Sequence, residues 1–179
     1  MFSIEPCDIP CDALLGKYID EGTYTDCYRV EIPRTVTYAQ YVVAFYTTLI
    51  FKLERLILKL AVSRPSTDAQ VVQLASGTVD DFAAWYVEGR SENQLLLCDF
   101  IGRTRSWLMV VPIADDNHVR TRLYFGSAVV PIVNTTTGES SLGFVYRSLL
   151  GFHKLYSVVL LYAAKLRLES LPVQSKIEF

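Results

Sequence analysis

Histidine is scarce in this chain, and cysteine spacing does not suit a metal site. The 179 residues include two histidines, two tryptophans and four cysteines. So few histidines leave a serine or cysteine nucleophile little choice of general base. The cysteines (Cys7, Cys11, Cys27 and Cys98) contain no pair separated by two residues, the spacing typical of zinc sites and thiol redox centres. We predict free thiols, with Cys7–Cys11 as a weaker pairing, and neither metal nor cofactor.

The chain also lacks an excess of charge of one sign. Seventeen Lys and Arg against 19 Asp and Glu give a net charge of −2, without the basic footprint that nucleic-acid binding needs. A hydrophobic fraction of 51% excludes a disordered chain. The length is that of one domain, so we predict a single domain over 1–179. Prolines and glycines make 1–22 an irregular lead-in.

Long hydrophobic runs are missing too, although the mean hydropathy is +0.25. The longest apolar segments, 41–51 and 155–164, are too short for the ~20 residues that span a bilayer. The first residues have neither the basic start nor the apolar run of a secretory signal. We expect no membrane span and a cytoplasmic protein.

A long helix is the clearest local feature. Thr37 and Gln40 form a capping box, and apolar residues then recur with a 3.6-residue period until Pro65 stops the helix. The apolar stripe of this helix consists of Val42, Phe45, Tyr46, Leu49, Leu53, Leu56, Ile57 and Leu60. The opposite face consists of Thr48, Lys52, Arg55 and Lys59. A second, short helix is predicted over 66–76, closed by Gly77.

Strands dominate the middle of the chain. Residues 24–32 alternate in polarity and end at Pro33. Four strands are predicted at 83–89, 94–101, 105–113 and 119–132, and their short connections require antiparallel neighbours. The last helix is predicted over 142–168. Its apolar stripe consists of Val145, Leu149, Phe152, Tyr156, Val159 and Ala163, with Lys154, Lys165 and Arg167 off the stripe.

The tightest strand registers divide the meander into two faces. One face consists of Tyr86, Glu88, Leu95, Leu97, Asp99, Ser106, Leu108, Val110, Leu123 and Phe125. The other consists of Trp85, Val87, Cys98, Phe100, Arg105, Trp107, Met109, Arg122 and Tyr124. Neither is the polar surface that an exposed antiparallel sheet normally shows, so something must cover each face.

One strand, two helices, an antiparallel meander and a long last helix is the element order of the helix-grip fold. Two blocks, Asn93–Asp99 with Arg103–Ser106 and Leu142–Tyr146 continuing to Gly151–His153, resemble a bacterial family of unknown function. That family lies in the polyketide-cyclase-like, START-like superfamily, and many members have proline where this chain has Gly151. The resemblance covers about 24–168. It implies an α+β fold, with a curved antiparallel sheet wrapped around the C-terminal helix and a ligand cavity between them, but no particular reaction.

The leading functional hypothesis is binding of a small apolar or amphipathic molecule in that cavity. Aliphatic side chains would supply affinity, and Tyr86, Asp99 and His153 would orient a polar end. The predicted ligand-binding residues are Tyr86, Glu88, Asp99, Leu108, Phe125, Leu149, His153 and Tyr156.

Two alternatives come from other classes. The first is a cyclase, hydratase or dehydratase using His153 with Asp99 or Glu88 as the acid–base pair. The second is a structural dimerisation domain, which the resemblance implies because relatives of the family are also found appended to nucleotide-binding oxidoreductase domains. This chain lacks a glycine-rich dinucleotide fingerprint, so its oxidoreductase partner would be a separate protein. A cavity of roughly 300 Å³ or more would exclude the purely structural alternative.

The second sheet face has the composition of an interface core. Aromatic residues, Met and Arg gather there and Lys is absent. We predict a homodimer whose interface consists of Trp85, Arg105, Trp107, Met109, Arg122 and Tyr124. The alternatives are an anion pocket built on Arg105 and Arg122, or a cover supplied by residues 1–22 of the same chain.

Overall fold

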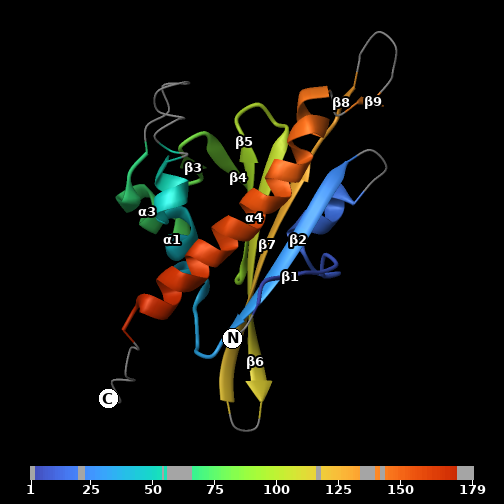
Figure 1. Ribbon diagram of the computed structural model, residues 1–179. Coiled ribbons are helices and arrows are strands. Elements are labelled where there is room, and N and C mark those ends of the chain that lie inside the picture. Colours follow the sequence, from blue (N-terminus) through green and yellow to red (C-terminus); the bar gives the residue numbers. More distant parts are fainter. Residues whose placement is uncertain are drawn as a thin grey trace.

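Seven antiparallel strands form one sheet, with helices against one face and the N-terminal segment against the other (Figure 1). The computed structural model describes residues 3–19, 23–53, 55, 66–115, 118–133, 140–141 and 144–172. Within these ranges it does not describe the side chains of 115, 118, 132–133, 140–141 and 144–153.

The sheet has the strand order β1-β2-β7-β6-β5-β4-β3. Its strands are β1 (Glu5–Pro6), β2 (Tyr24–Ile32), β3 (Asp81–Phe82), β4 (Trp85–Arg90), β5 (Gln94–Asp99), β6 (Thr104–Asp115) and β7 (His118–Val129). The other elements are the 3-10 helix η1 (Leu14–Tyr18), the helices α1 (Tyr38–Tyr46), α3 (Asp68–Ser76) and α4 (Phe144–Ser170), and the two-stranded pair β8 (Ile132–Val133) and β9 (Ser140–Ser141). This confirms the α+β class and the predicted meander, which β2 extends by pairing with β7.

The first predicted helix is interrupted, so the prediction of one continuous helix is wrong. The capping box at its start is confirmed. After α1, the Thr47 hydroxyl donates to the Val43 carbonyl at 2.5 Å, and the Thr48 hydroxyl donates to the Phe45 carbonyl at 3.0 Å. The Thr48 oxygen also accepts from the Phe51 amide at 3.2 Å. These local bonds end one helix and cap the start of the next, a competition with regular helix that threonine hydroxyls commonly provide.

The interruption changes which residues of the following helical segment, 49–53 and 55, are buried. Leu49 and Leu53, predicted in the apolar stripe, are 85% and 58% exposed. Thr48 and Arg55, predicted on the outer face, are buried. Arg55 donates to the Asp68 carboxylate of α3 at 2.7 Å. This salt bridge joins the helical segment after the interruption to α3.

The helix α4 crosses one face of the sheet diagonally and contacts α1, β2 and β7 (Figure 1). Its buried stripe, in the part whose side chains are described, consists of Ser157, Leu160, Leu161, Ala164, Lys165 and Leu168. The predicted stripe is therefore displaced: Tyr156, Val159 and Ala163 are half-buried. Because α4 packs against both α1 and the sheet, its buried face is turned toward α1. Leu149 and Phe152 lie outside the residues with described side chains.

The opposite sheet face is covered by the N-terminal segment, defined here as residues 3–19. Leu15 of η1 is fully buried in a cluster with Trp107, Met109 and Tyr124. A Cβ on Gly126 would lie 2.7 Å from the Leu15 side chain, so the segment can pack this closely only over glycine. Residues 3–19, the described part of the irregular lead-in predicted for 1–22, thus form a structural layer.

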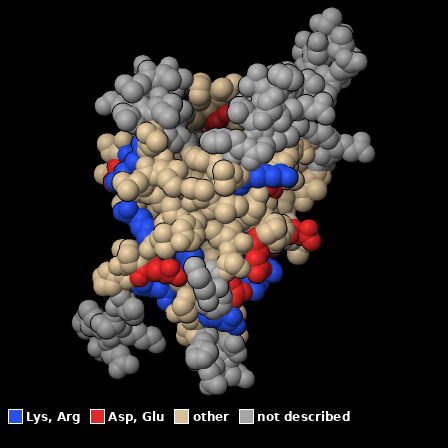
Figure 2. Space-filling model, in the orientation of Figure 1, with Lys and Arg blue, Asp and Glu red and all other residues tan. Residues whose placement is uncertain are grey.

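Charged side chains gather around the margin of the described surface on the helix side, whose centre over α4 and α1 is largely uncharged (Figure 2). Positive and negative groups both occur along this margin, as expected from a net charge near zero. None of the helical stretches in the described ranges combines the length and the hydropathy required to cross a bilayer.

Candidate functional site

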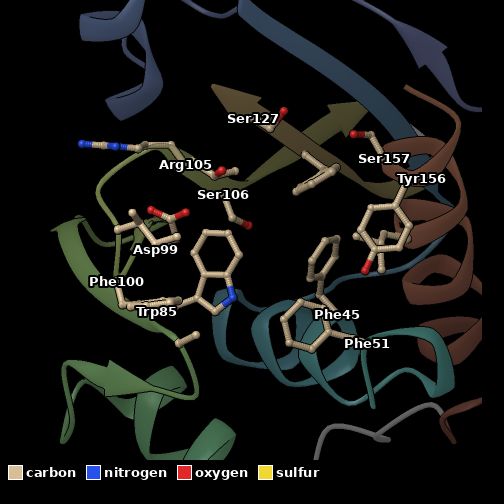
Figure 3. A pocket seen from close by; sticks show the side chains of 15 residues that line it. Phe45, Phe51, Trp85, Asp99, Phe100, Arg105, Ser106, Ser127, Tyr156 and Ser157 are labelled. Carbon is tan, nitrogen blue, oxygen red and sulfur yellow. The ribbon is translucent and has the colours of Figure 1, made fainter. Parts of the chain in front are cut away.

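A cavity of about 330 Å³ lies between the sheet and the helices α1 and α4 (Figure 3). Its lining consists of Phe45, Phe51, Ala84, Trp85, Asp99, Phe100, Ile101, Thr104, Arg105, Ser106, Phe125, Ser127, Tyr156, Ser157 and Leu160. Phe100 and Ile101 belong to the turn after β5 and are largely exposed, so the cavity reaches the surface beside that turn.

Three phenylalanines form an apolar wall. The ring centroids of Phe45 and Phe125 are 4.8 Å apart, and those of Phe45 and Phe51 are 6.3 Å apart. All three side chains are almost completely buried. Such mutually packed rings have little freedom to collapse inward, which keeps the space open. This wall suits the hydrocarbon part of a ligand.

The serines in the lining already have partners in the protein. The Ser106 hydroxyl is 3.2 Å from the Tyr46 hydroxyl. Ser127 and Ser157 donate to the carboxylate of Asp26, at 2.5 and 3.3 Å. These bonds hold β7 and α4 together at one end of the cavity, so the serines act first as structural groups.

Two charged residues of the lining are also engaged. Asp99 accepts a hydrogen bond from the Arg103 amide at 2.7 Å across the turn after β5. The guanidinium of Arg105 points away from the cavity (Figure 3), where its Nε lies 2.9 Å from the Glu88 carboxylate. Among the described lining residues, no unpaired arginine is therefore offered to an anionic group.

Trp85 carries the one lining polar atom in the described structure that is buried without a hydrogen-bond partner. Its indole Nε1 points toward the middle of the cavity, on the side of Phe45 and Phe51 (Figure 3). Leaving a buried donor unsatisfied costs about 1–3 kcal/mol, and most buried polar groups are paired. A hydrogen-bond acceptor in the cavity would remove this cost.

Three of the predicted ligand-binding residues line this cavity: Asp99, Phe125 and Tyr156. Leu108 is buried in the core on the same side but is not part of the lining. The side chains of Leu149 and His153 lie outside the described residues.

Tyr86 and Glu88 do not line this cavity, because both lie on the sheet face covered by the N-terminal segment. Beside the turn, Gly89 pairs with Leu96, and this register continued along the strand would place Phe100 opposite Trp85. A bulge between Val87 and Gly89 shifts the register by one residue, so Trp85 pairs with Asp99. Directly paired residues share a face of the sheet, so Trp85 joins Asp99 at the cavity.

The structure gives no support to the predicted dimer interface on this face. Trp107, Met109 and Tyr124 are buried within the chain, beneath the N-terminal segment. Trp85 lines the cavity on the other side of the sheet. The homodimer inferred from these residues is therefore an unsupported prediction.

The two arginines of that predicted interface each face a carboxylate of their own chain. Arg122 pairs with Glu31 at 2.7 Å, and Arg105 pairs with Glu88. The alternative of an anion pocket is therefore not supported, since these charges are already neutralised.

Glu88 is the centre of a polar cluster between η1 and the sheet, consisting of Lys17, Tyr18, Glu88 and Arg105. Lys17 pairs with Glu88, and the Tyr18 hydroxyl donates to it. Burial alone would raise the pKa of Glu88, but hydrogen bonds from Lys17 and Tyr18 and the charge of Arg105 bring it below its ordinary value. Burial, with Glu88 nearby, raises the pKa of Tyr18 to about 12.

This arrangement gives no support to the version of the enzymatic alternative that uses Glu88. Glu88 is paired with Lys17 and Arg105 on the sheet face opposite the cavity and is not part of the cavity lining, whereas Asp99 is. Among the residues that the structure describes, no group of three or more His, Cys, Asp or Glu side chains is placed to hold a metal ion.

Sequence reasoning missed most of the cavity lining. Phe45 belongs to the apolar stripe predicted for the first helix and Phe51 does not, and their convergence on the cavity depends on the break at Thr47 and Thr48. Ser157 was missed because the stripe of α4 was displaced. Adjacent threonines within a predicted helix were the available signal for the break.

No protein-family model matches the sequence, and no curated protein is similar to it. The resemblance to the START-like superfamily stays a prediction, and functional inference depends on the cavity itself.

Proposed function

We propose that this protein is a helix-grip, START-like domain that binds one small, neutral, largely apolar molecule in the cavity between the sheet and α4. The observation that carries the proposal is the unsatisfied Nε1 of Trp85, buried in a cavity whose wall is formed by Phe45, Phe51 and Phe125. An apolar pocket with a few convergent polar groups is typical of small-molecule sites.

The ligand should carry a hydrogen-bond acceptor, such as a carbonyl, ether or hydroxyl oxygen. Trp85 supplies a donor to it and no acceptor. A carboxylate or phosphate is disfavoured, because Asp99 contributes negative charge and Arg105 is directed toward Glu88. A cavity of 330 Å³ lies at the lower end of the range for ligand pockets, so the ligand is small.

The cavity favours ligand binding over a purely structural role, because a domain that only dimerises gains nothing from an open apolar cavity and loses packing energy.

Native mass spectrometry of the full chain purified from its own host tests the proposal directly. We expect a non-covalent adduct of one small molecule that denaturation releases. Titration with the neutral fluorescent probe N-phenyl-1-naphthylamine gives a second measurement, with saturable binding to one site.

A pair of matched variants locates that site. Ala84→Leu adds bulk inside the cavity lining and should weaken probe binding at least tenfold. Ala69→Leu makes the same change at an exposed position of α3 and should leave binding unchanged. Absence of any adduct together with equal probe binding by both variants would show that the cavity is not a binding site.

A further inference from the structure

Two cysteines far apart in the sequence meet where the N-terminal segment joins the sheet. The Sγ atoms of Cys7 and Cys27 are 3.4 Å apart, and the Cys7 amide donates to the Cys27 carbonyl at 3.0 Å. The register of β1 and β2 pairs Pro6 with Tyr28, so the next residue along β1 lies directly across from Cys27. Spacing along the chain points only to Cys7 with Cys11 as a pair.

The backbone geometry at this point suits a covalent link. Directly opposed residues of antiparallel strands have Cα atoms about 4.5–5.5 Å apart, within the range that disulfides bridge. The two sulfur atoms are already in contact, so a change of side-chain torsion angles is enough to bring them to bonding distance. The strands themselves need not move.

We propose that Cys7 and Cys27 form a reversible disulfide when the protein meets a low-molecular-weight disulfide such as oxidised glutathione. The Cys7 thiolate attacks one sulfur of the oxidant and releases the first thiolate. Cys27 then attacks the Cys7 sulfur of the mixed disulfide and releases the second. Two protein thiols are oxidised, one disulfide is reduced to two thiols, and the two thiol protons pass to the leaving thiolates.

The surroundings of the two sulfur atoms assign these roles. Cys7 is half-buried and open to a small oxidant, whereas Cys27 is buried. A hydrogen bond from the Cys27 thiol to the Cys7 thiolate lowers the pKa of Cys7, and the positive charges of Arg29 and Arg122 act in the same direction. The same hydrogen bond, together with burial, raises the pKa of Cys27. Cys7 is thus the attacking thiol.

The disulfide would fasten the N-terminal segment to the sheet. The segment covers Trp107 and Tyr124, and its link to the sheet beside these residues is non-covalent in the reduced protein. Closing a loop of the 20 residues that separate Cys7 from Cys27 constrains the unfolded chain. Oxidation should therefore stabilise the packing of the N-terminal segment on the sheet without altering the cavity on the other face.

Cys11 and Cys98 supply the controls. Cys11 is exposed and is the nearest competitor along the chain, whereas Cys98 is buried and its Sγ contacts the Asp99 carbonyl. The variants Cys11→Ser and Cys98→Ser keep the proposed pair. The variants Cys7→Ser and Cys27→Ala remove it.

The test is to incubate the full chain with oxidised glutathione and measure its intact mass. We expect Cys11→Ser to lose about 2 Da, for two hydrogens, and to recover them with dithiothreitol. Trypsin cleavage after Lys17 and Arg29 should then yield peptide 1–17 joined to peptide 18–29. A stable glutathione adduct without the joined peptides, or no reaction, would overturn the proposal.

Thermal unfolding supplies a second readout. Oxidised Cys98→Ser should melt about 5–10 °C above its reduced form, as expected for a loop of this length in a domain of this size. Cys7→Ser and Cys27→Ala should show no such difference. Oxidised wild type in which Cys7 is joined to Cys11 would also contradict the proposal, because that link does not fasten the segment to the sheet.

Discussion

The two tryptophans of the chain lie on opposite faces of one sheet, in opposite environments. Trp107 is fully buried beneath the N-terminal segment, and its Nε1 donates to Gln94 at 2.9 Å. Trp85 lies at the cavity on the helix face, and its buried Nε1 has no partner among the described residues. The same side chain is thus a satisfied structural element on one face and an open donor on the other.

The difference shows how the two covers work. Gln94 bonds Trp107, the Leu14 amide and the Asp12 carbonyl, so an irregular segment is held by side-chain hydrogen bonds in place of regular structure. The helix face is covered by apolar packing of α1 and α4, which leaves the cavity between these helices and the sheet. A face whose buried polar groups are all hydrogen-bonded should lose much stability on substitution, whereas a face with a cavity should lose less.

Trp107→Ala should produce the largest loss of stability. Truncating a fully buried tryptophan typically costs about 3–5 kcal/mol, and here it also leaves one Gln94 hydrogen bond unmade. Urea unfolding of both proteins measures the difference. Trp85→Ala is the matched control and should cost clearly less, because Trp85 is only partly buried. Equal losses would contradict the contrast between the two faces.

Gln94→Leu should produce the next largest loss of stability, about 2–4 kcal/mol. It keeps the volume but leaves the Trp107 Nε1 and the Leu14 amide without an acceptor. The double variant Gln94→Leu, Trp107→Phe removes both sides of one bond, so its loss should be smaller than the sum of the single losses. Additive losses would show that the hydrogen bond contributes little.

Much of the fold could be predicted because local signals determine it. The capping box at Thr37, the alternation over β2 and the short connections between β4 and β7 each depend on nearby residues. They give the α+β class, the meander and the last helix correctly.

The candidate site could be predicted only in part, because it depends on register and helix rotation. One-residue shifts at the bulge between Val87 and Gly89 exchange Tyr86 and Glu88 for Trp85 at the cavity. The hydroxyl bonds of Thr47 and Thr48 turn the following helical residues. Neither effect has a strong sequence pattern, whereas Asp99 and Phe125 lie beyond these irregularities and were placed correctly.

Glu88→Gln should have a smaller, pH-dependent effect on the segment-covered face. Folding lowers the pKa of Glu88, so its stabilising contribution is present above the ordinary carboxyl pKa and is lost as the pH falls through the lowered value. The variant should be less stable than wild type by about 1 kcal/mol at pH 7, and the difference should shrink steadily as the pH falls below the ordinary carboxyl pKa. Urea unfolding over a series of acidic pH values measures this, with Glu92→Gln on an exposed turn as control. A difference that does not change with pH would mean that the carboxylate charge is not the cause.

Trp85→Phe should change stability least but should weaken ligand binding. Phenylalanine keeps an aromatic ring at the cavity and removes the unsatisfied donor, so lost packing and relieved desolvation oppose each other. We expect a change of less than about 0.5 kcal/mol by urea unfolding. Trp107→Phe on the other face should cost more than about 1 kcal/mol, since it removes a satisfied bond. The ligand retained from the host should bind Trp85→Phe about 2–10-fold more weakly, as one neutral hydrogen bond implies. If Trp85→Phe instead binds it equally well, the ligand does not accept from Nε1, and the cavity selects by shape alone.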